Sequence, residues 1–276
     1  NLLKNEQKLI IFPWESHCWE RLLMNQISVR GRSKSIKTIG YQHTGFSYGL
    51  LQHFSTEFDS KQKIHPNVIF SCGETQKTKL DEIEGLTDVI KITVGSLRCK
   101  SKPNKRNLYS KANIEIKTIS VAMGYNQNNY EKIIEDLKKI NKNIKIFLFI
   151  HPLNYKFKPN LDTKKNIVCK KRRDNRIIKN SDLLIVDDNS LMIEGWTLGV
   201  PTIIYDSDSF ALTKRDWNSP ILHFNEENIS QIGNNEFMIK LNNSIENYLD
   251  SNYSSKYFHE INFSKFNNAL SDIIEY

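Results

Sequence analysis

The stretch "SDLLIVDDNSLMIEGWTLGVPTIIYD", residues 181–206, carries the pattern that decides the fold. Its apolar run at 182–188 predicts a buried strand, because short apolar runs between polar residues are typical of parallel sheets. A helix is predicted over 190–199, where a glycine ends it, and a second strand follows over 200–206. A strand, a polar loop, a helix and another strand in this order predict a parallel α/β unit.

The polar loop between that strand and the helix is a candidate anion-binding site. Asn189 and Ser190 stand at the predicted helix N-terminus, where free backbone N–H groups and the helix dipole favour negative charge. Glu194 follows Ser190 by one helical turn on the same face, where its carboxylate can accept hydrogen bonds from ribose or sugar hydroxyls. The alternative is an ordinary N-cap at Asp188, Asn189 or Ser190, with an incidental Glu194.

A second candidate site follows the apolar segment "FLFIHPLN", residues 147–154. The segment predicts a buried strand that stops at His151-Pro152. Ligands of α/β proteins gather at the carboxyl ends of parallel strands, so His151 and Ser190 can share one ligand. A strand end followed by a proline-containing turn is the alternative.

Strands and helices alternate along the whole chain in two blocks, separated by the basic, breaker-rich segment 97–113. We therefore predict an α/β protein with two Rossmann-like parallel-sheet domains facing a cleft. The acceptor-side domain is predicted over 1–96, and the donor-nucleotide-binding domain over 114–276, including the terminal helices. The first block has few strands and the chain starts at Asn1, which leaves open whether an N-terminal portion is missing.

The individual elements are predicted from the same apolar patterns. In the first block we expect strands at 8–12, 36–41, 67–72 and 88–94, with a helix over 15–27. In the second block we expect strands at 114–123, 144–150, 166–170, 182–188 and 200–206, and helices at 129–140, 190–199, 236–250 and 263–275.

Two titratable side chains follow strands of the first block. Glu15 stands directly after a predicted strand in "IFPWESHCWERL", residues 11–22, and His43 follows the next strand in "GYQHTG", residues 40–45. Both are catalytic candidates, because they are placed where α/β ligands gather. Among their neighbours we expect core packing for Trp14 and Trp19, a solvated helix surface for Glu20, and surface positions for His17 and His53.

The net charge of the chain limits the classes of partner that it is expected to bind. Its 276 residues carry a formal net charge of +8, which favours polyanions, acidic lipid surfaces or anionic substrates. The sequence has no zinc finger, RNP-like aromatic motif or clear helix-turn-helix, so nucleic acid is not the predicted partner. We interpret the basic runs at 100–106 and 170–176 as solvated loops.

The sequence predicts no metal site, no disulfide framework and no membrane-spanning segment. Four cysteines include no CxxC pair, so neither a disulfide framework nor a zinc framework is expected. Asp187 and Asp188 are adjacent rather than spaced, and we interpret them as a loop cap. No metal site is predicted. No apolar run approaches the roughly 20 residues of a membrane span, and no signal peptide is apparent. We predict a cytoplasmic protein, with peripheral contact at the acidic inner-membrane surface left open.

Residues 181–206 together with His151-Pro152 resemble the donor-nucleotide half of GT-B glycosyltransferases. The resemblance covers residues 114–206 well, the first block more loosely, and the C-terminal helices only in kind. In bacterial sialyltransferases and related CMP-sugar enzymes of this fold, a strand ends in His-Pro and the histidine contacts the nucleotide phosphate. A Ser/Thr motif further along binds the same group. The resemblance therefore implies that His151 and Ser190 hold a donor phosphate.

The first block is similar to a Tyr/Phe-Pro-x-Glu stretch in bacterial surface-carbohydrate biosynthesis proteins, including a following Trp-Glu, here Trp19-Glu20. "GYQHTG" also resembles those proteins. The acidic triplet ending in glycine that marks sialyltransferases is absent, so no base is carried over from it. We instead predict Glu15 as the base, with Trp14 shielding its carboxylate, and His43 orienting the acceptor or assisting the phosphate.

These features predict a metal-independent glycosyltransferase that moves an acidic sugar, Kdo or a nonulosonic acid, from a CMP-activated donor. The acceptor is expected to be a surface glycan or glycolipid, and no cofactor is expected. An imidazole, a hydroxyl and a helix N-terminus can stabilise the negative charge that departing CMP gains. The alternatives are a CDP-glycerol-type polyol-phosphate transferase, a UDP-sugar transferase, a non-catalytic nucleotide-sugar or glycan-binding module, and a basic nucleic-acid-binding protein.

Overall fold

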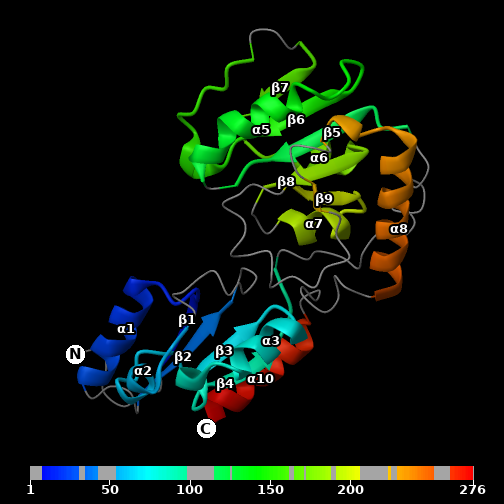
Figure 1. Ribbon diagram of the computed structural model, residues 1–276. Helices are drawn as coiled ribbons and strands as arrows, with labels where there is room; N and C mark the ends of the chain where they lie inside the picture. Colours follow the sequence, from blue (N-terminus) through cyan, green and yellow to red (C-terminus); the bar gives the residue numbers. More distant parts are fainter. Residues whose placement is uncertain are drawn as a thin grey trace. The chain divides into compact units, whose positions relative to one another are not determined.

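The chain forms two compact units in a computed structural model (Figure 1). Unit 1 comprises Asn1–Lys102 with Ser255–Tyr276, and unit 2 comprises Pro103–Ser254. The predicted linker at 97–113 lies outside the described residues except for its first residue. The structure describes residues 8–30, 35–42, 54–97, 115–124, 126–161, 165–170, 172–187, 191–205, 223–224, 229–251 and 262–275.

Unit 1 is built on a parallel sheet of four strands in the order β1-β2-β3-β4. The strands are β1 (Lys8–Pro13), β2 (Ile36–Tyr41), β3 (Val68–Ser71) and β4 (Ile90–Thr93). The connections contain α1 (Cys18–Val29), α2 (Glu57–Lys61), α3 (Glu74–Asp81) and the 3₁₀ turn η2 (Glu84–Leu86). Because successive strands are neighbours and all are parallel, their carboxyl ends form one continuous edge.

Alternate residues of these strands face two different cores, as the period of two in a strand requires. Ile69 joins a cluster with residues of α1 and α3, whereas Val68 and Phe70 on either side of it face the opposite cluster. Trp14 belongs to the α1 side and packs tightly over Gly40, since a Cβ at Gly40 would lie 2.7 Å from the Trp14 Cβ. Both faces of the sheet are therefore buried.

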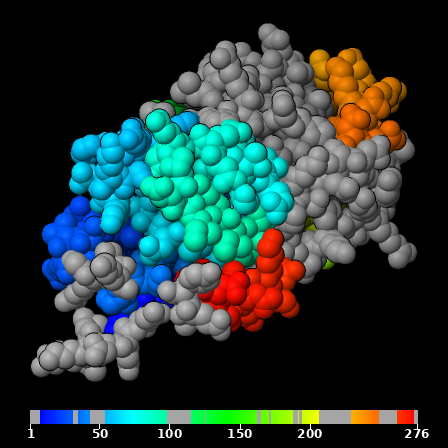
Figure 2. All heavy atoms as spheres, turned by 90° about the horizontal axis from the view of Figure 1, so that it is seen from below, coloured from blue at the N-terminus to red at the C-terminus, as the bar shows by residue number. Residues whose placement is uncertain are grey.

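The opposite face of this sheet is covered by the C-terminal helix α10 (Phe263–Glu275). Ala269 and Ile273 of α10 are buried there, and the Phe266 ring meets Phe70 edge-on at 5.2 Å between centroids. Figure 2 shows this red helix lying against the cyan part of unit 1. This helix was predicted within the second domain, 114–276; it instead packs on the first sheet, because that face has no other described helix to bury it.

Unit 2 is built on a parallel sheet of six strands in the order β10-β9-β8-β5-β6-β7. The strands are β5 (Thr118–Ala122), β6 (Lys145–Phe149), β7 (Ile167–Lys170), β8 (Leu183–Val186), β9 (Thr202–Tyr205) and β10 (His223–Phe224). The chain builds β6 and β7 on one side of β5 and then returns to build β8 on the other. The order therefore reverses at β5, and ligands of open α/β sheets bind at such a reversal.

The helices of unit 2 bury one apolar stripe each. They are α5 (Tyr130–Leu137), α6 (Asn175–Asn180), α7 (Leu191–Thr197) and α8 (Asn235–Ser251), with 3₁₀ turns η3 (Gln127–Asn129), η4 (Pro152–Asn154) and η7 (Ile229–Gln231). In α5 the buried Tyr130, Ile133, Ile134 and Leu137 follow helical spacing. Trp196 of α7 stacks on Tyr248 of α8 with 4.2 Å between the ring centroids, which ties these two helices together.

Two parallel-sheet α/β units confirm the predicted fold class, and every predicted strand is present with shifts of a few residues at its ends. The short elements α2, α6 and β10 were not predicted. The basic run at 170–176 was interpreted as a solvated loop, yet its last two residues begin α6 and Arg173 forms an ion pair with Glu194.

Candidate functional site

The predicted donor-binding residues follow, along the chain, the two strands that flank β5. Ala122, the last residue of β5, aligns with Phe149 of β6 on one side and with Val186 of β8 on the other. His151 stands two residues beyond Phe149, and the described chain after β8 ends at Asp187. Neighbouring strands lie about 4.8 Å apart, so the ends of β6 and β8 are close enough for one small ligand to reach both.

Three strand ends are joined here by buried hydrogen bonds. The Gly124 amide, just after β5, donates to Asp187 Oδ2 at 3.2 Å, and a Cβ at Gly124 would lie 2.9 Å from that same oxygen. The Tyr130 hydroxyl donates to the Gly124 carbonyl at 2.5 Å and accepts from the His151 amide at 3.4 Å. Burial raises the pKa of Tyr130. The side chain of Asp187 thus caps the loop after β5, as the sequence predicted for it.

The His151-Pro152 pair forms a small, rigid cap. His151 Nδ1 accepts the Leu153 amide at 3.3 Å, and Pro152 opens the 3₁₀ turn η4, in which its missing N–H is not needed. Burial lowers the pKa of His151, so the neutral ring dominates at neutral pH. Since Nδ1 accepts, the ring proton sits on Nε2, which becomes a hydrogen-bond donor fixed at the carboxyl end of β6.

Of the other predicted donor-binding residues, Glu194 is described by the structure, whereas Asn189 and Ser190 are not. Asn189 and Ser190 lie outside the described residues, directly before α7. Glu194 in α7 is buried, and its Oε2 accepts from Arg173 Nη2 at 2.5 Å. A sugar hydroxyl was the predicted partner of this carboxylate, and Arg173 was missed because no sequence spacing links residues 21 positions apart.

A cavity of about 540 Å³ opens beside the His151 cap. It starts at Ile150, the residue before His151, and reaches Cys169 of β7. Its size is typical of small-molecule sites. The remaining wall is the segment after η4, which combines aromatic rings with ammonium groups: Tyr155, Lys156, Phe157, Lys158, Pro159 and Leu161.

In unit 1, the loop after β1 places Glu15 and His17 together. His17 Nε2 and Glu15 Oε2 lie 2.9 Å apart, with side-chain exposures of 46% and 20%. The pair is therefore accessible to a substrate at the carboxyl end of β1. His17 is exposed, as expected, but its contact with Glu15 was not predicted, although the spacing Glu-x-His allows it. Trp14 is buried in the core with residues of α1, as expected for it.

Glu20 holds the same loop in place. It was predicted to be solvated, yet it is buried, and its Oε2 accepts the amides of Glu15 at 3.0 Å and His17 at 3.2 Å. This is how a carboxylate in the first helical turn satisfies free N–H groups. Burial raises the pKa of Glu20, while these backbone hydrogen bonds oppose the rise. Trp19, which was expected in the core, is 51% exposed, with its ring edge-on to Phe12.

Ser16, between Glu15 and His17, adopts a left-handed backbone with φ of 60°. Non-glycine residues seldom take this conformation, and it requires support from the surroundings. Arg21 gives that support by donating to Ser16 Oγ from Nε at 3.2 Å and from Nη2 at 3.1 Å. A strained turn held by a buried carboxylate and a guanidinium thus presents Glu15. His43 lies outside the described residues, as does His53.

We expect Glu20→Ala to loosen this loop. Loss of the acceptor for two amides should lower the free energy of unfolding by about 1–2 kcal/mol. The Glu15 and His17 amides should also exchange with solvent faster, which hydrogen-exchange mass spectrometry or NMR measures. Glu57→Ala is the matched control, because Glu57 only pairs with Lys61 on the exposed surface of α2. Equal stability and equally slow exchange in both variants would contradict this role of Glu20.

Among the described residues, no cluster of three or more His, Cys, Asp or Glu could hold a metal ion. Among the described cysteines, Cys18, Cys72 and Cys169 form no disulfide with one another. The helices within the described ranges include none with the length and apolarity needed to cross a membrane.

Solved structures share this architecture at low sequence identity. Arabidopsis thaliana UGT89C1, complexed with quercetin, is 12% identical, with 92% of this chain and 70% of that chain covered and a TM-score of 0.54. The wall teichoic acid polymerase TagF is 12% identical over 88% of this chain and 69% of its own, with a TM-score of 0.51. The α,α-trehalose-phosphate synthase (UDP-forming) from Burkholderia vietnamiensis is 10% identical over 99% of this chain and 73% of its own, with a TM-score of 0.52.

These similarities, with the two parallel sheets, show that the chain has a GT-B-like fold. No protein-family model matches the sequence, and no curated protein matches it either.

Proposed function

We propose that this protein is a glycosyltransferase that transfers an acidic sugar, Kdo or a nonulosonic acid, from a CMP-activated donor to a surface glycan or glycolipid. The observation that carries the proposal is the donor N–H of His151 at the reversal of strand order in a GT-B-like sheet. A neutral imidazole can donate to a phosphate oxygen without a net charge change of its own. The GT-B-like relatives support transfer from an activated sugar in general.

In the proposed reaction, Glu15 removes the proton from an acceptor hydroxyl as its oxygen attacks the anomeric carbon. The bond from that carbon to the phosphate oxygen breaks, and its electron pair leaves with CMP. His151 Nε2–H donates to the phosphate and stabilises the charge it gains. His17, at 2.9 Å from Glu15, fixes the orientation of the carboxylate. The resemblance to sialyltransferase motifs supports this role for His151, and the strained, supported turn at Ser16 supports the role of Glu15.

The nucleotide itself is tested by a thermal-shift screen of CMP, CDP, UDP and ADP. A ligand that binds only the native state adds about 2.7 kcal/mol of stability at one hundred times its dissociation constant. We expect CMP to raise the unfolding temperature most. A larger shift with CDP or UDP would reject the CMP donor while leaving a transferase of another donor class, and no shift with any nucleotide would reject donor binding altogether.

A CDP-glycerol-type transferase is the second candidate, because TagF resembles the chain and has also been solved after soaking with CDPG. CDP carries a second phosphate, and Lys156 and Lys158 beside the His151 cap offer positive charge for it. A UDP-sugar transferase is a third candidate, because a UDP-forming synthase is among the similar structures. The same nucleotide screen separates all three.

A further inference from the structure

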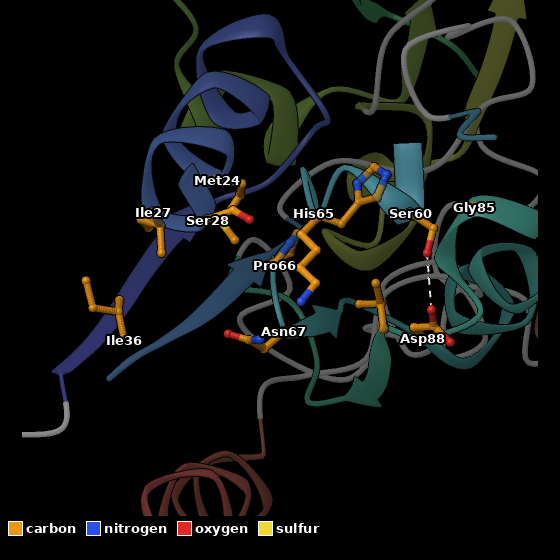
Figure 3. A pocket seen from close by; sticks show the side chains of 12 residues that line it. Met24, Ile27, Ser28, Ile36, Ser60, His65, Pro66, Asn67, Gly85 and Asp88 are labelled. Carbon is orange, nitrogen blue, oxygen red and sulfur yellow. Dashed lines mark hydrogen bonds between the residues drawn. The ribbon is translucent and has the colours of Figure 1, made fainter. Parts of the chain in front are cut away.

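A second cavity, of about 370 Å³, lies in unit 1 at the edge opposite to Glu15 (Figure 3). Ile36 in its wall is the first residue of β2, while Asn67 and Val89 directly precede β3 and β4. These are the amino ends of the parallel strands, whereas Glu15 follows the carboxyl end of β1. This amino-edge cavity is therefore separate from the site proposed for the reaction.

The wall of the amino-edge cavity has two chemically different sides. Met24 and Ile27 of α1 and Ile36 of β2 line one side with C–H groups. On the other side Ser60 Oγ donates to Asp88 Oδ2 at 3.2 Å, the dashed line in Figure 3. Lys63 also lines the cavity, so the lining carries one ammonium group and one carboxylate. The lining thus fits a molecule without net charge that has one apolar face and one polar face.

His65 adds a buried acceptor to this lining. It is 7% exposed, and its Nδ1 has no hydrogen-bond partner within the part of the chain that the structure describes. Its Nε2 contacts Ser55 Oγ, and Ser55 in turn donates to Asp59 Oδ2 at 3.3 Å. Hydrogen bonds from Thr56 lower the pKa of Asp59, so this carboxylate is ionised and only accepts.

This chain of hydrogen bonds fixes the tautomer of His65. The single Ser55 proton goes to Asp59, so Nε2–H donates to Ser55 Oγ and Nδ1 keeps a lone pair. Burial, with the nearby Arg21, lowers the pKa of His65 to about 4, which keeps the ring neutral at physiological pH.

Asn67 supplies the complementary donor. Its Oδ1 accepts from the Thr38 amide at 2.9 Å and from Thr38 Oγ1 at 2.8 Å, which orients the amide and leaves Nδ2 as the donating group. Hydroxyl groups both donate and accept, so a polyol can match Asp88 and Asn67 together. The C–H face of a sugar ring can pack against the isoleucines opposite.

We propose that the amino-edge cavity is a second binding site, for a neutral sugar unit. The proposal does not depend on the donor nucleotide, because the cavity lies at the other edge of the sheet. Unit 1 would then bind a sugar unit at a place separate from the site where the acceptor hydroxyl reacts.

Ligand-observed NMR titration tests this site with methyl glucoside, methyl galactoside and N-acetylglucosamine as probes. Glucuronate serves as the anionic comparison and cyclohexanol as the apolar one. We expect saturation transfer to at least one neutral sugar. Ser28→Phe, which fills the cavity from the half-buried side of α1, should abolish it, and Asp88→Asn should weaken binding about tenfold or more.

Glu57→Gln is the control that should leave sugar binding unchanged, because its side chain is exposed on α2. Circular dichroism shows whether each variant is folded. If Ser28→Phe does not fold, sugar binding by Asp88→Asn tests the site. No transfer to any neutral sugar, stronger binding of glucuronate or cyclohexanol, or full binding by folded cavity variants would each overturn the proposal. The nucleotide screen reports on the donor site separately, so failure of one does not imply failure of the other.

Discussion

Glu15→Gln should bind CMP as the parent protein does, while its turnover falls by about a hundredfold or more. Glutamine keeps the shape of the side chain and can still contact His17, but it cannot take a proton from an acceptor hydroxyl. Glu15 is suited to this task because its backbone is held by the Glu20 carboxylate at 3.0 Å. Its carboxylate is also paired with His17 at a partly exposed position.

The measurement is release of CMP from the donor with acceptor present, alongside CMP affinity by calorimetry. Glu57→Gln serves as the control for a general charge effect, since its carboxylate pairs only with Lys61 on the surface. Near-normal turnover in Glu15→Gln, with loss of turnover in His43→Ala, would assign the base to His43. Unchanged turnover in both variants would remove this loop from the mechanism.

His151→Ala should weaken CMP binding by about tenfold or more, because a hydrogen bond to a charged group contributes about 1.5–3 kcal/mol. Alanine removes the Nε2–H donor and also the Nδ1 acceptor that caps η4. His151→Asn separates these two roles, since asparagine is a good cap but does not place an N–H where the imidazole does.

Equal losses of CMP affinity in the alanine and asparagine variants would support direct contact with the phosphate. Recovery of affinity in His151→Asn would show that His151 acts only by shaping the turn. Pro152→Ala keeps the imidazole and is the matched control in the same turn. Unchanged CMP affinity in folded His151→Ala would refute the assignment.

The strands could be predicted because their apolar runs are short and separated by polar turns. The run at 182–188 contains β8, Leu183–Val186, whose four residues are all buried. Strand β10 has only two residues and hence no pattern to detect. The position of α10 could not be predicted either, because an amphipathic helix shows which face it buries but not which sheet it covers.

The positions of the candidate residues after strand ends were predicted, whereas contacts between residues distant in sequence were not. His151 and Glu15 stand directly after patterned strands. The contact from Tyr130 to His151 and the ion pair from Arg173 to Glu194 join residues 21 positions apart, which no local pattern records. Glu20 was misjudged because capping by a helix-start carboxylate is usually signalled by Ser or Thr at the N-cap, and here His17 stands there.

The packing of α10 on the first sheet sets the order in which the chain can fold during synthesis. Residues 1–102 emerge from the ribosome before residues 103–276, yet among the described helices it is α10, Phe263–Glu275, that covers one face of their sheet. Unit 2, residues 103–254, is completed earlier than unit 1. At about 5–20 residues per second, the exposed sheet face waits roughly 10–30 s for its helix. During that interval the nascent protein presents Val68, Phe70 and their neighbours to chaperones, and separate expression of residues 1–102 would make this exposure permanent.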